Sequence, residues 1–128
     1  MEEEIIETSV ANCWRIDPGI NVIIFKAGAE AELSDVEENF AALKELNKGE
    51  PSPLFLDITK LKYMDRDART YSARKEATTD VQALAILIGS PVGKMLGGFF
   101  LGLNKPPYPT KLFTVKEEAI AWLKGFVE

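Results

Sequence analysis

The order of short apolar runs and amphipathic helical patterns constrains the fold of this chain more than any single motif. Apolar runs of strand length stand at 13–16, 22–25, 54–56, 83–88 and 111–113. Helical patterns stand at 33–46, 65–79, 90–103 and 114–126. Parallel strands need such crossover helices between them. The order ββαβαβαβα therefore predicts an α/β domain with a mixed, mostly parallel sheet and one antiparallel edge strand from the opening hairpin.

Three of these helices carry recognisable start signals. Ser34 and Glu37 have the spacing of a capping box, and Thr114 and Glu117 repeat that spacing before the last helix. Asp65 is placed to accept a hydrogen bond from the first turn of the helix that follows it. We therefore expect helices to begin at these three places.

Size and composition fit a single domain spanning 1–128, since 128 residues is the commonest length for one core. The acidic start, Met1–Glu7, lacks the basic and apolar regions of a secretory signal, so we expect a cytoplasmic protein. Cys13 is the only cysteine, which excludes an internal disulfide. It stands in a predicted strand beside Trp14, and we expect a buried, unreactive thiol.

Catalytic and metal-binding patterns are missing from the sequence. The chain has no histidine, which removes the usual general base and the commonest metal ligand. The glycines of the 90–103 segment do not have the spacing of a phosphate-binding loop. Asp57, Asp65 and Asp67 leave carboxylate chemistry open, because all three stand near the carboxyl end of a predicted strand. The main expectation is a protein without catalytic residues, metal or cofactor.

Charge and hydropathy exclude two kinds of partner. The net charge of −5 repels phosphate backbones, and the basic residues at 60–75 are interleaved with acidic ones, so we expect no nucleic-acid binding. The most apolar segment, 90–103, is shorter than the roughly 20 residues that a membrane-spanning helix needs. We therefore expect no membrane insertion.

The segment Leu54–Arg69 runs from a buried strand through a turn, Tyr63-Met64-Asp65, into a helix. It resembles the corresponding stretch of STAS domains, the SpoIIAA-like anti-sigma-factor antagonists. The predicted order of elements also resembles that family across nearly the whole chain. The resemblance implies a SpoIIAA-like fold and a role in binding another protein.

The family switches its binding at a hydrophobic-Asp-Ser-Ser-Gly turn, whose second serine is phosphorylated by the partner kinase. The resemblance places Asp65 on the aspartate, Arg66 on the first serine, Asp67 on the phosphoacceptor and Ala68 on the glycine. A carboxylate carries about one charge where phosphoserine carries about 1.5 to 2. The resemblance thus implies a module that lacks the phosphoacceptor serine, with Asp67 as a fixed and weak mimic at most.

A second informative feature is the glycine-rich segment 90–103, whose only charged residue is Lys94. Small uncharacterised bacterial proteins of STAS-like or SEC14-like type look similar in this region. A helix that is apolar all round is normally buried, so tight packing on its own sheet is one interpretation. The other is an interaction surface, formed by Met95, Phe99, Phe100, Leu103 and Tyr108.

The sequence thus predicts a non-enzymatic protein-interaction module of STAS type. Its partner would be another protein or a second copy of the chain, and we expect a homo-oligomer, most simply a dimer. The alternative is a carrier or sensor that holds a small apolar ligand or lipid in a pocket beside the glycine-rich helix.

Overall fold

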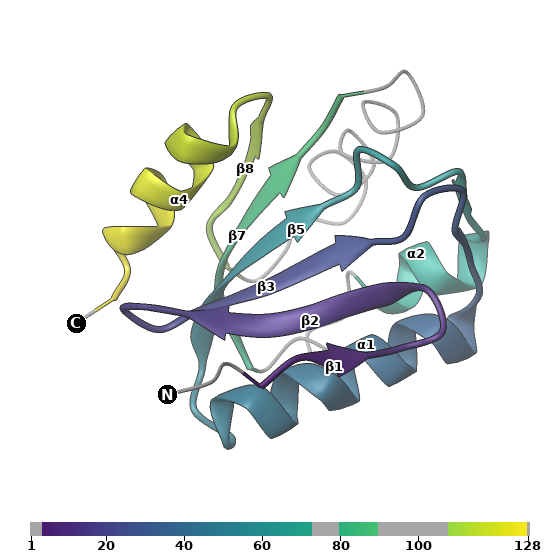
Figure 1. The fold of residues 1–128 in the computed structure, drawn as a ribbon, viewed down its shortest axis with the longest axis horizontal. Helices are drawn as coiled ribbons and strands as arrows, with labels where there is room; N and C mark the ends of the chain where they lie inside the picture. Colours follow the sequence, from purple (N-terminus) through teal and green to yellow (C-terminus); the bar gives the residue numbers. More distant parts are fainter. Residues whose placement is uncertain (1–3, 73–79, 90–107, 128) are drawn as a thin grey trace.

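The computed structural model describes residues 4–72, 80–89 and 108–127 (Figure 1). Its strands are β1 (Ile6–Glu7), β2 (Ala11–Ile16), β3 (Ile20–Phe25), β4 (Glu30–Ala31), β5 (Ser52–Asp57), β6 (Tyr63–Met64), β7 (Val81–Leu87) and β8 (Thr110–Phe113). Its helices are α1 (Leu33–Asn47), α2 (Arg66–Ser72) and α4 (Lys116–Lys124). The predicted helix at 90–103 and the second half of the predicted helix at 65–79 lie outside the described residues.

Six strands form the main sheet in the order β1-β2-β3-β5-β7-β8. The β1–β2 and β2–β3 pairs are antiparallel, whereas β3–β5, β5–β7 and β7–β8 are parallel. The predicted mixed, mostly parallel α/β sheet is therefore confirmed. One detail differs from the prediction. The strand β1, which the sequence did not indicate, pairs with β2 on the side away from β3 and forms the antiparallel edge of the sheet.

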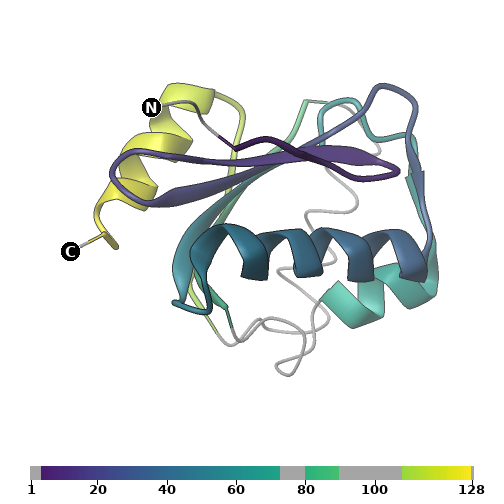
Figure 2. The same ribbon diagram turned by 60° about the horizontal axis from the view of Figure 1, so that its bottom comes forward.

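The helices lie on both faces of the sheet, as Figure 2 shows with α1 and α2 below the strands and α4 on the other side. The helices α1 and α2 connect β3 to β5 and β5 to β7, and each crossover moves one strand along the sheet in the same direction. Right-handed crossovers that advance in one direction put their helices on the same face. The α1 and α2 helices also pack on each other, with the Phe40 and Tyr71 rings edge to face at 5.8 Å.

Each face of the sheet has its own apolar core. Side chains of β3 point alternately to the two faces of the sheet and contribute to both cores. Ile23 and Phe25 pack in the core under α1 and α2, while Ile20 and Val22 pack in the core under α4. Strand β3 is consequently buried on both faces, as its continuous apolar run predicts. On the α4 face, Phe55 of β5 is completely buried.

The start of α1 differs from the prediction. The N-cap is Glu32, whose backbone N–H donates a hydrogen bond of 2.9 Å to Asp35 Oδ2, so the capping pair is Glu32 and Asp35 instead of Ser34 and Glu37. The physical reason is that Ala31 is held in β4, where it pairs with Met64. The chain therefore enters the helix directly after that strand, two residues before Ser34.

The start of α4 also differs from the prediction. The N-cap is Val115, which has an extended backbone and no side-chain cap, so the predicted capping box of Thr114 and Glu117 does not form. Glu117 and Glu118 instead lie in the first turn, where their charges favour the positive end of the helix dipole. The apolar side of α4, with Ala119 and Leu123 completely buried, fixes the helix on the sheet.

Candidate functional site

The connection from β5 to α2 carries the turn that the sequence singles out, and its aspartates are used for local hydrogen bonds. Asp57 Oδ1 accepts hydrogen bonds from Thr59 N at 2.9 Å and from Thr59 Oγ1 at 2.6 Å. The next residue, Ile58, donates its N–H to the carbonyl oxygen of Leu87 at 3.1 Å. Asp57 thus forms an Asx turn at the carboxyl end of β5.

Asp65 caps α2, which confirms the sequence prediction for this residue. Its Oδ1 accepts a hydrogen bond of 2.8 Å from the backbone N–H of Ala68, and its own N–H donates to the carbonyl oxygen of Ala31 at 3.0 Å. The cap satisfies one of the free N–H groups of the first turn. Ala68 is completely buried at this point, in the position where the family has glycine.

The other two residues of the motif turn face solvent. Arg66 and Asp67 are both exposed, and Asp67 lies in the first turn of α2. The structure thus separates the turn into an inward-facing cap, Asp65, and two charged side chains that a partner can reach. The role of Asp67 as a phosphate mimic stays a prediction.

A short parallel ribbon that sequence reasoning missed lies directly beside this turn. Glu30 and Ala31 of β4 pair with Tyr63 and Met64 of β6. Backbone hydrogen bonds from Gly28 N to Lys60 O and from Lys62 N to Ala29 O, each 2.9 Å, extend the ribbon. The ribbon joins the loop that follows β3 to the loop that follows β5 by backbone hydrogen bonds.

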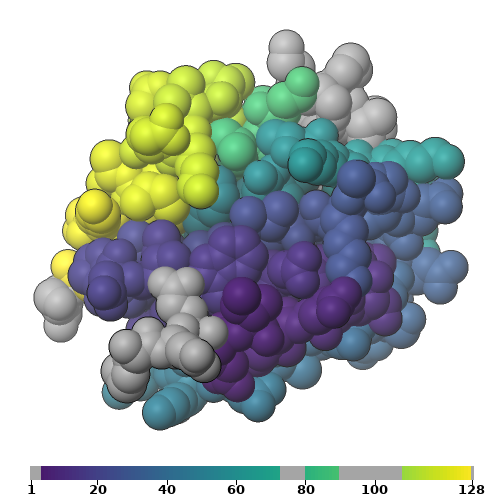
Figure 3. All heavy atoms as spheres, in the orientation of Figure 1, coloured from purple at the N-terminus to yellow at the C-terminus, as the bar shows by residue number. Residues whose placement is uncertain are grey.

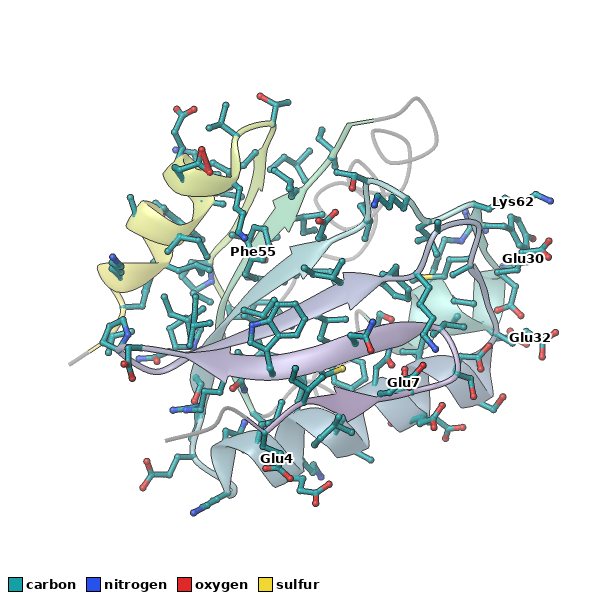
Figure 4. The ribbon with its side chains drawn as sticks, viewed as in Figure 1. Glu4, Glu7, Glu30, Glu32, Phe55 and Lys62 are labelled. Atoms are coloured by element: carbon teal, nitrogen blue, oxygen red, sulfur yellow. The ribbon has the colours of Figure 1, made fainter. Side chains whose placement is uncertain are left out.

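The ribbon and the start of α2 form one surface, which we call the carboxyl-end rim, made of Glu30, Glu32, Leu33, Lys62, Tyr63, Arg66 and Asp67. In Figure 4 the labelled side chains of Glu30, Glu32 and Lys62 project outward at this end of the molecule. Two large apolar side chains are exposed among the charges, Tyr63 at 53% and Leu33 at 36%. The available signal in the sequence was an aromatic residue between Lys62 and the Asp65 cap, in the connection that follows a buried strand.

Cys13 lies in β2 with no exposed surface, as the sequence predicts. Burial raises the pKa of its thiol to about 12, and the negative charge of Glu38 adds to the effect. Because the thiolate is the reactive form, this cysteine is unsuited to nucleophilic or redox chemistry near neutral pH.

The interaction surface predicted around the glycine-rich segment lies mostly outside the described residues. Met95, Phe99, Phe100 and Leu103 lie outside the described residues. Tyr108 is half-buried and packs against the core under α1 and α2. It lines an apolar cavity of about 40 Å³ together with residues of α1, β3 and β5. Pockets for small ligands are usually about ten times larger. The alternative of an apolar ligand beside the glycine-rich helix stays a prediction, because that helix lies outside the described residues.

Comparison with known proteins establishes the class of this domain. A solved structure, that of an uncharacterized protein of the DUF3478 family with a SpoIIAA-like fold from Shewanella loihica PV-4, is similar to it with a TM-score of 0.54 and 17% sequence identity. The similarity covers 95% of this chain and 92% of the Shewanella chain. The domain therefore has a SpoIIAA-like fold, as the resemblance to STAS domains implied.

The family follows from the sequence itself. Residues 14–127 match the model of a domain of unknown function, DUF7793, and the chain belongs to that family. A comparison with curated proteins found no match. In the described part of the chain, no helix combines the length and the apolar character needed to cross a bilayer.

Proposed function

We propose that this domain is a non-enzymatic protein-interaction module of STAS type that binds a protein partner through the carboxyl-end rim. The observation that carries the proposal is Tyr63, which is 53% exposed beside the motif turn instead of packed into the core. Tyrosine is enriched among the residues that contribute most to binding energy at interfaces. Its placement next to Arg66 and Asp67 gives an aromatic anchor with charged neighbours.

The arrangement favours a partner that is bound without a phosphorylation switch at this turn. Asp67 offers a permanent carboxylate where the resemblance places a phosphoacceptor, and Arg66 offers a guanidinium next to it. The rim carries both signs of charge, which favours specificity over long-range attraction. A cytoplasmic location is part of the proposal and agrees with the free, buried thiol of Cys13.

The test is affinity capture of partners from an extract of the native cell, with three forms of the protein compared. The wild type, Tyr63→Ser and the control Ile5→Ser are used as baits, because Ile5 is another large apolar residue that is exposed, at 63%, and is not part of the rim. We expect a partner that the wild type and Ile5→Ser retain and that Tyr63→Ser loses by about tenfold or more. Equal recovery by all three baits would refute the role of the rim.

Asp67 provides a second test of the same surface. The variant Asp67→Ser restores a hydroxyl at the position of the family's phosphoacceptor. If Asp67 acts as a fixed mimic, partner binding should change when a cognate kinase phosphorylates this serine. Phosphorylation without any effect on binding would remove Asp67 from the proposal.

A second copy of the chain is the other expected partner, through the segment that carries Met95, Phe99, Phe100 and Leu103. Size-exclusion chromatography with light scattering distinguishes a mass near 14.2 kDa, that of one chain, from a multiple of it. We expect a dimer that the double variant Phe99→Ser/Phe100→Ser converts to monomer. A monomeric wild type would contradict self-association and leave the rim proposal intact.

A further inference from the structure

The described helices cover the two faces of the sheet unequally. On one face lie α1 and α2, whereas on the other α4 packs mainly on β5, β7 and β8. Six strands about 4.8 Å apart make a sheet about 24 Å wide, and a helix is about 10 Å in diameter. The described residues of the α4 face therefore leave room for a second helix over β2 and β3. Figure 3 shows this side of the molecule, with the purple-to-blue surface of β2 and β3 in view beside the yellow surface of α4.

The strip of β2 and β3 beside α4 carries apolar side chains that are only half-buried. Trp14 and Ile16 of β2 and Ile24 of β3 pack against the core under α4 and keep part of their surface exposed. The other tryptophan of the chain, Trp122 of α4, is also half-buried. Tryptophan is among the residues that contribute most to binding energy at interfaces. A second apolar surface laid on this strip would remove the remaining area from water.

Helix periodicity determines which side of α4 faces the strip. The Trp122 ring packs on the Phe113 ring of β8, with the ring centroids 5.7 Å apart. Two positions along a helix turn a side chain by about 200°. Ile120 therefore points away from β8, toward the side of the sheet that carries β3 and β2.

Ile120 belongs to a stripe that runs along the outer side of α4. The stripe consists of Glu117, Ile120, Ala121 and Lys124, whose spacing of three and four residues places them on one face of the helix. Ile120 is half-buried and the other three are exposed. Together with Lys116 they line an open hollow of about 250 Å³. Because the small side chain of Ala121 stands in the middle of the stripe, another helix can approach α4 closely there.

The charges of the stripe are complementary to those of a second copy of the same helix. Glu117 lies three residues before Ile120, and Lys124 lies three residues after Ala121. If two such helices pack antiparallel about a two-fold axis between positions 120 and 121, Glu117 of each copy faces Lys124 of the other. The opposite ends of the two helix dipoles then also lie side by side. A parallel pair would place glutamate against glutamate and lysine against lysine.

We propose that this face is a homodimer interface, in which α4 packs antiparallel against α4 of a second copy and each copy covers the strip of β2 and β3 of the other. A stable interface of standard size buries about 800 Å² on each partner, which is more than one stripe of a nine-residue helix supplies. The strip with Trp14 and Ile24 is therefore part of the contact. The interface goes beyond the proposed partner binding, because it uses no residue of the carboxyl-end rim.

The interface also shares no residue with the segment 90–103, the other candidate for self-association. The two assignments predict opposite results for the double variant Phe99→Ser/Phe100→Ser. A dimer formed through α4 persists in that variant, whereas a dimer formed through the segment 90–103 dissociates.

The test is the dissociation constant of the dimer, measured on the full chain by sedimentation equilibrium at low ionic strength. Glu117→Lys places like charges opposite each other at both ends of the antiparallel pair and should weaken the dimer by about tenfold or more. Lys124→Glu should weaken it to a similar extent. The double variant Glu117→Lys/Lys124→Glu exchanges the two charges and should restore the dimer.

Glu118→Lys is the matched control for these charge reversals. Glu118 is the other acidic residue in the first turn of α4, so its replacement has the same effect on the helix dipole, but it lies off the stripe. This variant should form the dimer as the wild type does. Circular dichroism of every variant checks that the helices are retained.

Ala121→Gln tests the centre of the interface without a change of charge. Glutamine is a good helix former and Ala121 is exposed, so the variant should fold normally. Its longer side chain occupies the hollow next to the two-fold axis. We expect a monomer at concentrations at which the wild type is a dimer.

The proposal fails if the wild type is monomeric, or if Glu117→Lys and Ala121→Gln both leave the dimer intact. It also fails if the exchange of Glu117 and Lys124 does not restore the dimer, because the antiparallel arrangement requires that rescue. A dimer that Phe99→Ser/Phe100→Ser dissociates and Glu117→Lys leaves intact would assign self-association to the segment 90–103 instead. The capture test with Tyr63→Ser is independent of all these results, because no substituted residue lies in the rim.

Discussion

The two ends of the sheet are built in opposite ways. At the carboxyl end the side chains of Asp57 and Asp65 accept hydrogen bonds from the local backbone, and other residues of the rim, such as Tyr63, are exposed. At the amino end Arg15 donates hydrogen bonds to buried neutral side chains and lines two open hollows. The aspartates at one end make local hydrogen bonds, whereas the arginine at the other end links three strands.

The largest expected difference between the ends concerns stability. Arg15→Met removes the donor that satisfies the buried Asn21 and Ser52 side chains, and we expect a loss of about 1–3 kcal/mol in the free energy of unfolding. Arg66→Met at the rim removes an exposed side chain and should change it by less than about 0.5 kcal/mol. Urea denaturation of both variants measures the contrast. Equal stabilities would show that Arg15 is not part of the fold's hydrogen-bond network.

The cap of α2 should have a smaller effect. Asp65→Ala removes the acceptor for the Ala68 N–H and should destabilise the protein by about 1 kcal/mol. Asp65→Asn, which keeps a capping oxygen, is the matched control and should retain most of the stability. If the two variants are equally destabilised in thermal unfolding, the carboxylate charge and not the cap would be responsible.

Tyr63 should matter for binding and not for folding. Tyr63→Ser changes a side chain that is half exposed, so we expect a change in unfolding free energy of no more than about 0.5 kcal/mol. Differential scanning calorimetry of the purified variant measures it. A loss of several kcal/mol would mean that Tyr63 is a core residue and not a binding residue.

The smallest expected effect depends on pH. Lys26 lowers the pKa of Glu7 from its usual 4.5, first through a hydrogen bond and then through its charge. Because the pKa is lower in the folded state, the pair contributes stability above about pH 4.5, and this contribution is lost as the pH falls through the folded-state pKa. Both groups lie at the surface, so the contribution is small. Lys26→Met should be slightly less stable than the wild type at pH 6, and the difference should shrink as the pH falls through the folded-state pKa of Glu7. A difference that stays constant as the pH is lowered would contradict the pairing.

The arrangement of strands and helices could be predicted because each element has its own periodic apolar pattern. The continuous run at 22–25 indicated a strand buried on both faces, and Asp65 indicated the start of α2. The caps of α1 and α4 were predicted at the wrong residues because spacing alone does not show where the preceding strand ends. Ala31 is held in β4 by Met64, more than 30 positions away in the chain. Such a long-range pairing has no local signal.

The candidate sites were less predictable for the same reason. Tyr63 was part of the quoted motif, but nothing local showed that it would stay exposed. Arg15 was expected only as the neighbour of Cys13, because its partners Asn21 and Ser52 come from two other strands. The cap by Asp65 was predicted correctly, since a cap is made between residues close in sequence, whereas the Asx turn of Asp57 was not predicted.

The most direct test of the central claim is photocrosslinking in the native cell. A photoreactive phenylalanine analogue is placed at Tyr63 in the rim or at Val115, which is also exposed, at 41%, but lies before α4. The proposed function predicts an adduct with one protein from position 63 and none from position 115. No adduct at position 63, or the same adduct from both positions, would contradict a partner-binding role for the carboxyl-end rim.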